Sequence, residues 1–280
     1  MRSIVAIALA ATLVFAVVAC SSTGGDQSGN SATSGTPDIH TEVVTYEAGG
    51  VQCKGFVAYD KARKGKRPGV LVVHEWWGQT DYPRNRCRML AALGYVAFAV
   101  DMYGEGKLGE NPEEAGKLAT GVFSDMANAK ARFTVAHEWL KNNEMCDADH
   151  IAAIGYCFGG GIVLAMARAG EDLDGVVSFH GMLATETPAK AGEVKAHVLV
   201  CHGADDQFVP AEQVEAFKKE MSDAGVDMKF IAYPDSTHAF TNPEATAKGK
   251  EFGIPVAYNE AADKKSWEDM KMFFHELFEH

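Results

Sequence analysis

A short segment in the middle of the chain places the strongest constraint on its fold. Residues 151–161 read IAAIGYCFGGG, an apolar run followed by Cys157 between glycines. The apolar run predicts a buried strand, and residues 158–169 predict a helix directly after it. The turn between them must be sharp, and the flanking glycines allow the strand and the helix to approach closely. The helix N-terminus then directs free N–H groups and the positive end of its dipole towards the sulfur, which favours a thiolate.

A cysteine in such a segment can also be a small buried apolar residue, as most cysteines are. The pattern G-x-C-x-G therefore indicates catalysis only if the rest of the chain supplies a base, an acid that orients the base, and a pocket for an oxyanion. With serine in place of cysteine, the pattern is that of the nucleophile elbow of α/β-hydrolases.

Strands and helices alternate along most of the chain. Residues 42–48 and 51–59 alternate in polarity around Gly49-Gly50 and predict an antiparallel hairpin. Further strands are predicted at residues 69–74, 95–100, 151–154, 173–179, 196–201 and 228–233, and helices at residues 84–93, 111–140 with a break near Gly121, 158–169, 210–224 and 266–278. This order predicts a single-domain α/β fold with a mostly parallel sheet and helices on both faces.

The first 40 residues are not expected to belong to this fold. Arg2 and the apolar run over residues 4–19 predict a signal peptide at residues 1–19. The run ends Val-Val-Ala-Cys, which resembles the lipobox of bacterial lipoproteins and implies a lipid on Cys20; the alternatives are a plain signal peptide cleaved near Ala19 and an uncleaved anchor. Residues 20–40 would then be the lipidated N-terminus and a flexible Ser-, Gly- and Thr-rich linker, and residues 41–280 the domain. We expect an exported protein, lipid-anchored at the bacterial cell envelope, on the periplasmic face in a cell with two membranes.

Charge and cysteine content narrow the range of partners. The net charge is −12 without a basic stripe, which argues against a nucleic-acid partner. The spacings of Cys53, Cys87, Cys146 and Cys201 do not suggest a zinc site, and no other metal or cofactor is indicated. Export permits disulfides, and these four cysteines allow three full pairings, although Cys201 lies in an apolar run and is expected to be a buried free thiol. We expect a monomer that acts on a small molecule.

Reactive side chains follow the predicted parallel strands, and such residues gather at one edge of a sheet. Cys157 needs a base, and the candidate is His238, in a loop after the last strand; the alternative is a solvated loop histidine. Asp206 is the candidate acid in preference to Asp205, which we expect in solvent. The order cysteine, aspartate, histidine is the α/β-hydrolase order. Three further histidines follow strands without such partners, and of these only the second remains a candidate to line the pocket: His74, His180 and His202.

From about Val43 to its C-terminus the chain resembles the dienelactone hydrolase family of α/β-hydrolases. The resemblance rests on five blocks in order, namely residues 74–78 (HEWWG), 94–104 (GYVAFAVDMYG), 155–160 (GYCFGG), 203–210 and 233–240. It implies an α/β-hydrolase fold and a hydrolase of the carboxymethylenebutenolidase type, which cleaves an ester or lactone. It also implies that the family's catalytic cysteine, aspartate and histidine fall on Cys157, Asp206 and His238.

The resemblance implies roles for three more residues. A glutamate after the first parallel strand, matched by Glu75, contacts the resting thiol in the family and helps to form the thiolate. The alternative for Glu75 is a salt bridge with Arg84 or Arg86. The backbone N–H groups of Trp76 and Phe158 match the oxyanion hole, in which one donor typically contributes about 10²–10³-fold to the rate.

The resemblance is weakest where the family holds the carboxylate of its substrate with arginines. One of those positions, four residues after the histidine, is Asn242 here, and no arginine occurs between Arg88 and Arg132 to supply the other. Lys117 is a candidate cation, with a solvated helix lysine as the alternative. Recognition of a substrate carboxylate therefore stays open. An apolar, aromatic pocket is suggested by four residues, each with core or surface cover as the alternative: Trp76, Trp77, Tyr103 and Phe123.

Two other functions remain as alternatives. An envelope lipoprotein can use a hydrolase scaffold only to bind a ligand or a partner, without catalysis. A complete set of cysteine, aspartate and histidine argues against this, because a binding protein has no use for it. Thiol redox chemistry at Cys157 is less consistent with the sequence, since no C-x-x-C partner lies nearby.

Overall fold

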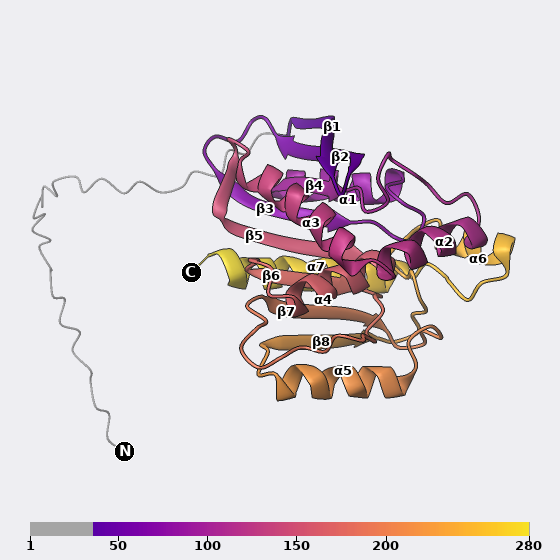
Figure 1. The fold of residues 1–280 in the computed structure, drawn as a ribbon. Coiled ribbons are helices and arrows are strands. Elements are labelled where there is room, and N and C mark those ends of the chain that lie inside the picture. Colours follow the sequence, from indigo (N-terminus) through magenta and orange to yellow (C-terminus); the bar gives the residue numbers. More distant parts are fainter. Residues whose placement is uncertain (1–35, 280) are drawn as a thin grey trace, which may run out of the picture. The chain divides into compact units, whose positions relative to one another are not determined.

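An eight-stranded sheet forms the centre of the fold (Figure 1). The computed structural model describes residues 36–279. The predicted signal peptide and the predicted lipidation site at Cys20 lie outside the described residues, as does most of the predicted linker. The strands are β1 (Ile39–Ala48), β2 (Val51–Asp60), β3 (Arg67–Val73), β4 (Val96–Val100), β5 (Cys146–Tyr156), β6 (Gly175–Phe179), β7 (His197–Gly203) and β8 (Met228–Tyr233). The helices are α1 (Asp81–Leu93), α2 (Pro112–Phe123), α3 (Met126–Lys141), α4 (Phe158–Arg168), α5 (Ala211–Asp223), α6 (Ala245–Phe252) and α7 (Glu260–Phe278).

The strand order is β1-β2-β4-β3-β5-β6-β7-β8. β1 and β2 form the predicted antiparallel hairpin, and β2 pairs antiparallel with β4, while β3 to β8 are all parallel. The register aligns the strand ends, because Val73 pairs with both Val100 of β4 and Gly155 of β5. The residues that follow these strands therefore emerge at one edge. The predicted α/β fold with a mostly parallel sheet is confirmed.

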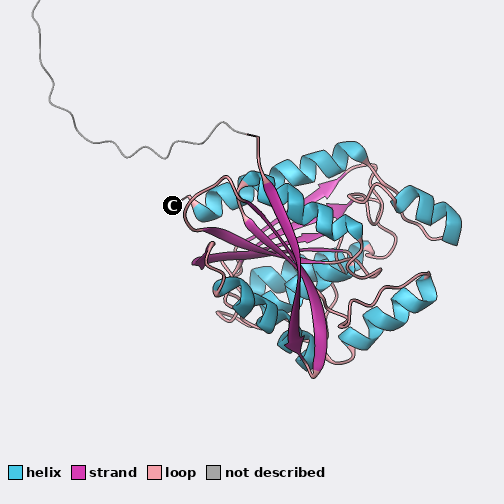
Figure 2. Cartoon of the chain, turned by 90° about the horizontal axis from the view of Figure 1, so that it is seen from above, coloured by secondary structure: helices cyan, strands magenta, loops and turns pink. Residues whose placement is uncertain are grey.

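Helices cover both faces of the sheet, as Figure 2 shows. Successive side chains of a strand point to opposite faces, so Leu71 and Val73 pack under α3 and α4, whereas Val70 and Val72 pack under α1. The core against α5 belongs to the first face, and the core against α7 to the second. Burial on both sides explains why the strands read as continuous apolar runs.

Several boundaries differ from the prediction, and local capping explains two of them. The break predicted near Gly121 in the helical region 111–140 is present and lies after Phe123, because the side chain of Asp125 accepts the N–H of Asn128 and caps a new helix. The last helix begins at Glu260 instead of residue 266, because Asn259 caps it. β5 begins at Cys146, five residues before the prediction, beyond a register shift at Pro68/Gly69 of β3.

One helix was not predicted at all. α6 has the sequence ATAKGKEF, in which a glycine and two lysines hide any apolar periodicity, and only Ala245 is buried within it. It lies beside the pocket described below. No helix among residues 36–279 is long and apolar enough to cross a membrane.

No disulfide links cysteines within the described part of the chain. Cys201 is a buried free thiol, as predicted, and the other cysteines of residues 36–279 are also free: Cys53, Cys87, Cys146 and Cys157.

Candidate active site

Cys157 sits on a strained turn between β5 and α4. Its backbone has φ 55° and ψ −116°, in the left-handed region that residues with a Cβ seldom adopt. A Cβ on Gly155 would lie 2.0 Å from the carbonyl oxygen of Gly159, and one on Gly159 would lie 2.3 Å from that of Val73. The strand, the turn and the helix thus approach closely only because both positions are glycine. The sulfur is left half-buried, at the wall of a pocket.

His238 lies beside this sulfur and is held by a carboxylate. Its Nδ1 lies 2.8 Å from Oδ2 of Asp206, and both residues are buried. The other carboxylate oxygen of Asp206 accepts the N–H of Phe208 at 2.9 Å, whereas neighbouring Asp205 is exposed. Burial lowers the pKa of His238, but Cys157 and Asp206 outweigh it and raise that pKa to about 10. The imidazole therefore favours its charged form between the sulfur and the carboxylate.

Glu75, directly after β3 and His74, is buried in the same pocket. Burial raises the pKa of its carboxyl group to about 7. Asn242 donates from Nδ2 to Oε2 of Glu75 at 2.6 Å, while its Oδ1 accepts the N–H of Glu244 and so fixes the orientation of the amide. The alternative of a salt bridge from Glu75 to Arg84 or Arg86 is not seen among residues 36–279, where Arg86 pairs instead with Asp263 at 2.5 Å.

The pocket has a volume of about 210 Å³ and is mostly apolar. Its one lysine is Lys248 of α6, with Nζ 4.5 Å from the centre of the Trp77 ring and no ion pair within residues 36–279. The lining residues are Glu75, Trp76, Trp77, Ala119, Phe123, Cys157, Phe158, Met182, Phe208, His238, Ala239, Asn242, Ala245, Lys248, Ile254 and Val256.

Three expected pocket residues lie elsewhere. Tyr103 is behind the wall and donates from its hydroxyl to the carbonyl oxygen of Trp76 at 2.8 Å. Lys117 is exposed, pairs with Glu113 and faces a different cavity. His180 does not line the pocket either, and its ring packs behind the elbow. Trp76 and Phe123 line the pocket as expected, with Trp77.

The backbone N–H groups of Trp76 and Phe158 have no hydrogen-bond acceptor among the described residues. Phe158 is the first residue of α4, where N–H groups lack partners within the helix. Both residues line the pocket together with Cys157. Two free donors next to a sulfur suit a negatively charged oxygen. Within residues 36–279, no group of three or more His, Cys, Asp or Glu side chains is placed to hold a metal ion.

The sequence profile of the dienelactone hydrolase family matches residues 53–278. The chain belongs to this family. Protein usf of Aquifex pyrophilus is 35% identical over 72% of this chain and 87% of its own length. The solved structure of P91, a dienelactone hydrolase-like promiscuous phosphotriesterase from metagenomic libraries, superposes with a TM-score of 0.79 at 35% identity, covering 85% of this chain and 98% of P91. The structure of m3DLH has a TM-score of 0.81 at 38% identity, covering 86% and 99%.

Membership of this family makes the chain a hydrolase of carboxylic esters or lactones, and a non-catalytic binding protein is not favoured. Sequence reasoning did not find the partners of the site. Asn242 was noted only as a missing arginine, and α6 with Lys248 was absent from the predicted elements. Phe208, whose ring packs edge-on to His238 with 5.0 Å between centres, had no signal beyond its position two residues after Asp206.

Proposed function

We propose that the enzyme transfers the acyl group of an ester or lactone to the sulfur of Cys157, with a triad of Cys157, Asp206 and His238. The observation that carries this proposal is the 2.8 Å contact between His238 and Asp206, with the same imidazole coupled to the sulfur. The carboxylate fixes the ring so that its Nε2 is free for proton transfer.

The reaction takes place in two halves. The thiolate of Cys157 adds to the carbonyl carbon, forming the S–C bond while the carbonyl electrons move to oxygen. The tetrahedral intermediate then breaks the C–O bond to the alcohol, which receives a proton from His238. Water adds to the thioester, His238 takes up a proton, and the S–C bond breaks to release the acid and restore the thiolate.

The N–H groups of Trp76 and Phe158 are the proposed oxyanion donors, since neither has another acceptor in the described residues. Glu75 is proposed to help form the thiolate when substrate binds. A carboxyl group with a pKa of about 7 exchanges a proton readily at neutral pH, and Glu75 shares the pocket with Cys157.

The proposed substrate is a small, largely apolar ester or lactone. The pocket walls are mainly aromatic and aliphatic, and no arginine lines the pocket. Asn242, at the position of one family arginine, is already engaged with Glu75 and offers no charge. Lys248 is the single side chain of the lining with an ammonium group for an anionic part of a substrate.

The proposal is tested with Cys157→Ala and, as a matched control, Cys201→Ala, which removes a thiol from the buried core of the other face. With a small activated ester such as 4-nitrophenyl butyrate, C157A is expected to lose at least about 10³-fold in kcat/KM. C201A is expected to keep the activity per folded molecule. Mass spectrometry of the wild type after rapid quenching should find the acyl group on Cys157. Undiminished turnover by C157A would refute the cysteine mechanism.

We also infer that the mature protein is a monomer, exported and attached to the bacterial envelope by a lipid on Cys20. Support for export and anchoring comes from the sequence of residues 1–40, in which a short apolar run ends in Val-Val-Ala-Cys before a linker rich in serine and glycine.

A further inference from the structure

A buried hydrogen-bond chain lies behind the elbow, on the side away from the pocket. It starts at the N–H of Cys157, which is shared between the carbonyl oxygen of Phe179 at 3.0 Å and Nδ1 of His180 at 3.1 Å. Nε2 of His180 lies 2.7 Å from the hydroxyl oxygen of Thr241. His180 and Thr241 are completely buried, so both nitrogens of this ring are satisfied inside the protein.

These contacts are compatible with only one tautomer of the His180 ring. An N–H group only donates, so Nδ1 must present a lone pair to Cys157. The ring proton is then on Nε2, where the hydroxyl of Thr241 accepts it. A protonated or Nδ1-protonated ring would set two N–H groups against each other at the elbow. The backbone of His180 is itself in the left-handed region, with φ 40°, so the ring is held at the cost of local strain.

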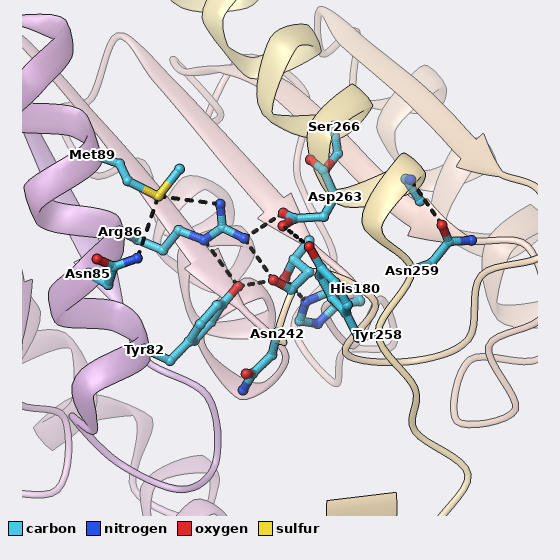
Figure 3. A network of polar contacts seen from close by, with 12 residues as sticks. Tyr82, Asn85, Arg86, Met89, His180, Asn242, Tyr258, Asn259, Asp263 and Ser266 are labelled. Atoms are coloured by element: carbon cyan, nitrogen blue, oxygen red, sulfur yellow. Dashed lines mark hydrogen bonds and ion pairs between the residues drawn. The ribbon is translucent and has the colours of Figure 1, made fainter. Parts of the chain in front are cut away.

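Two side chains of α1, Tyr82 and Arg86, hold Thr241, and Figure 3 shows these two residues in the surrounding polar network. The hydroxyl of Tyr82 in α1 lies 2.6 Å from its Oγ1, and Arg86 of the same helix donates to its carbonyl oxygen at 2.7 Å. Arg86 is anchored in turn by the carboxylate of Asp263 in α7. The hydroxyl that holds His180 is therefore part of a hydrogen-bonded network that includes side chains of α1 and α7.

The charges that face His180 oppose its protonation. His238 lies in edge contact with 5.3 Å between ring centres, and Arg86 and His202 are also close. Tyr156 of β5 is a neutral neighbour, with 6.1 Å between ring centres. Burial first, and then these positive groups, hold the pKa of His180 well below its ordinary range.

We propose that Thr241 is a positioning residue, whose hydroxyl fixes His180 in the Nε2–H tautomer so that Nδ1 holds the backbone of Cys157 in its strained conformation. The elbow then keeps the sulfur towards His238 and the Phe158 N–H towards the pocket. The expected effect on kinetics rests on the proposed function. The expected tautomer of His180 does not depend on it.

Three variants separate this role from a general effect on folding. Thr241→Val keeps the shape and removes the hydroxyl, and Thr241→Ser restores the hydroxyl. Thr134→Val is the control, because Thr134 is half-buried and its hydroxyl likewise bonds a side chain, that of Glu171, which is not part of the hydrogen-bond chain behind the elbow. Thermal unfolding of each variant records the stability cost.

The first readout is the tautomer of His180, from ¹⁵N NMR of histidine-labelled protein, assigned with a His180→Gln variant. We expect Nε2–H in the wild type, T241S and T134V, and a mixture of tautomers in T241V. A wild-type His180 that carries its proton on Nδ1 overturns the proposal without any variant. This readout needs no substrate, so it is independent of whether the ester reaction is correct.

The second readout is kinetic, with the same activated ester and with alkylation of Cys157 by iodoacetamide. In T241V we expect kcat to fall about 10- to 100-fold with little change in KM, the size expected for one lost buried hydrogen bond at the site. T241S should recover to within about threefold of the wild type. A T241V protein that melts earlier but keeps the wild-type kcat and alkylation rate per folded molecule would show a merely structural hydroxyl and overturn the inference. If the wild type is alkylated at Cys157 but does not cleave esters, the proposed function fails, and the tautomer and alkylation results still decide the role of Thr241.

Discussion

Glu75 and His238 face the same pocket, and their environments shift their proton affinities by different means. Burial raises the pKa of the Glu75 carboxyl to about 7, so its neutral form is favoured at mildly acidic pH. Burial alone would also favour a neutral imidazole, but the sulfur of Cys157 and the carboxylate of Asp206 raise the pKa of His238 to about 10. One group can therefore give up a proton near neutrality while the other keeps one.

The raised pKa of Glu75 predicts that the free energy of unfolding depends on pH. The Glu75 carboxyl has its ordinary pKa of 4.5 in the unfolded chain and a pKa of about 7 in the folded one. The contribution of the protonated group to the free energy of unfolding is therefore fully present below pH 4.5 and is lost as the pH rises through 7. Glu75→Gln stays neutral at every pH and still accepts from Asn242. The variant should therefore gain stability relative to the wild type between these pH values, by on the order of 3 kcal/mol at most.

Urea unfolding at pH 5 and pH 8 measures this difference. The control is Glu251→Gln, which neutralises an exposed carboxylate on α6 and records the effect of removing one surface charge. A gain for E75Q that is the same at both pH values would contradict a proton-linked origin.

At the scale of residues, the meeting of Cys157, Asp206, His238 and Glu75 at one edge could be predicted, because each follows a strand of a parallel sheet. Their hydrogen-bond partners could not be predicted. Asn242 is 167 residues from Glu75, and nothing in local sequence pairs the two. An alignment of strand ends brings side chains to an edge, whereas the packing of loops decides which of them touch.

At the scale of elements, the prediction was most accurate where apolar runs were long and where close packing requires glycine. The turn and the helix around Cys157 follow the prediction closely, as do the parallel strands other than β5, which begins five residues early. The prediction failed for α6, because a short helix with one buried residue has too little periodicity to be seen. Since α6 supplies Lys248, the wall of the pocket was incomplete in the sequence view.

Two glycines in helices should respond to substitution in opposite ways. Gly159→Ala in α4 places a methyl group 2.3 Å from the carbonyl oxygen of Val73, so we expect a loss of more than about 2 kcal/mol in the free energy of unfolding. Gly116→Ala in α2 meets nothing within 4 Å and removes backbone freedom, so it should stabilise by about 0.5–1 kcal/mol. Urea denaturation compares the two. Equal effects would mean that close packing at the elbow is not what requires glycine.

At the scale of the whole molecule, the proposal places a lipid on Cys20 and a linker between that residue and the hydrolase domain. In a bacterial host, the full-length protein should sediment with membranes and incorporate labelled palmitate, whereas Cys20→Ala should do neither. Cys53→Ala is the control, because it removes a buried core thiol and should leave fractionation unchanged. A C20A protein that stays with the membrane would point to an uncleaved apolar anchor.

The free cysteines of the described domain differ in the solvent exposure of their thiols. Cys53, Cys87, Cys146 and Cys201 are fully buried, and burial raises the pKa of Cys53 to about 11 and those of Cys146 and Cys201 to about 12, with that of Cys87 also raised. These thiols stay protonated and enclosed at neutral pH, while Cys157 is half-buried beside an imidazole. With Cys157 as the proposed nucleophile, the number of equivalents of a mild alkylating reagent that the folded domain consumes would count the intact sites in a preparation, without the use of a substrate.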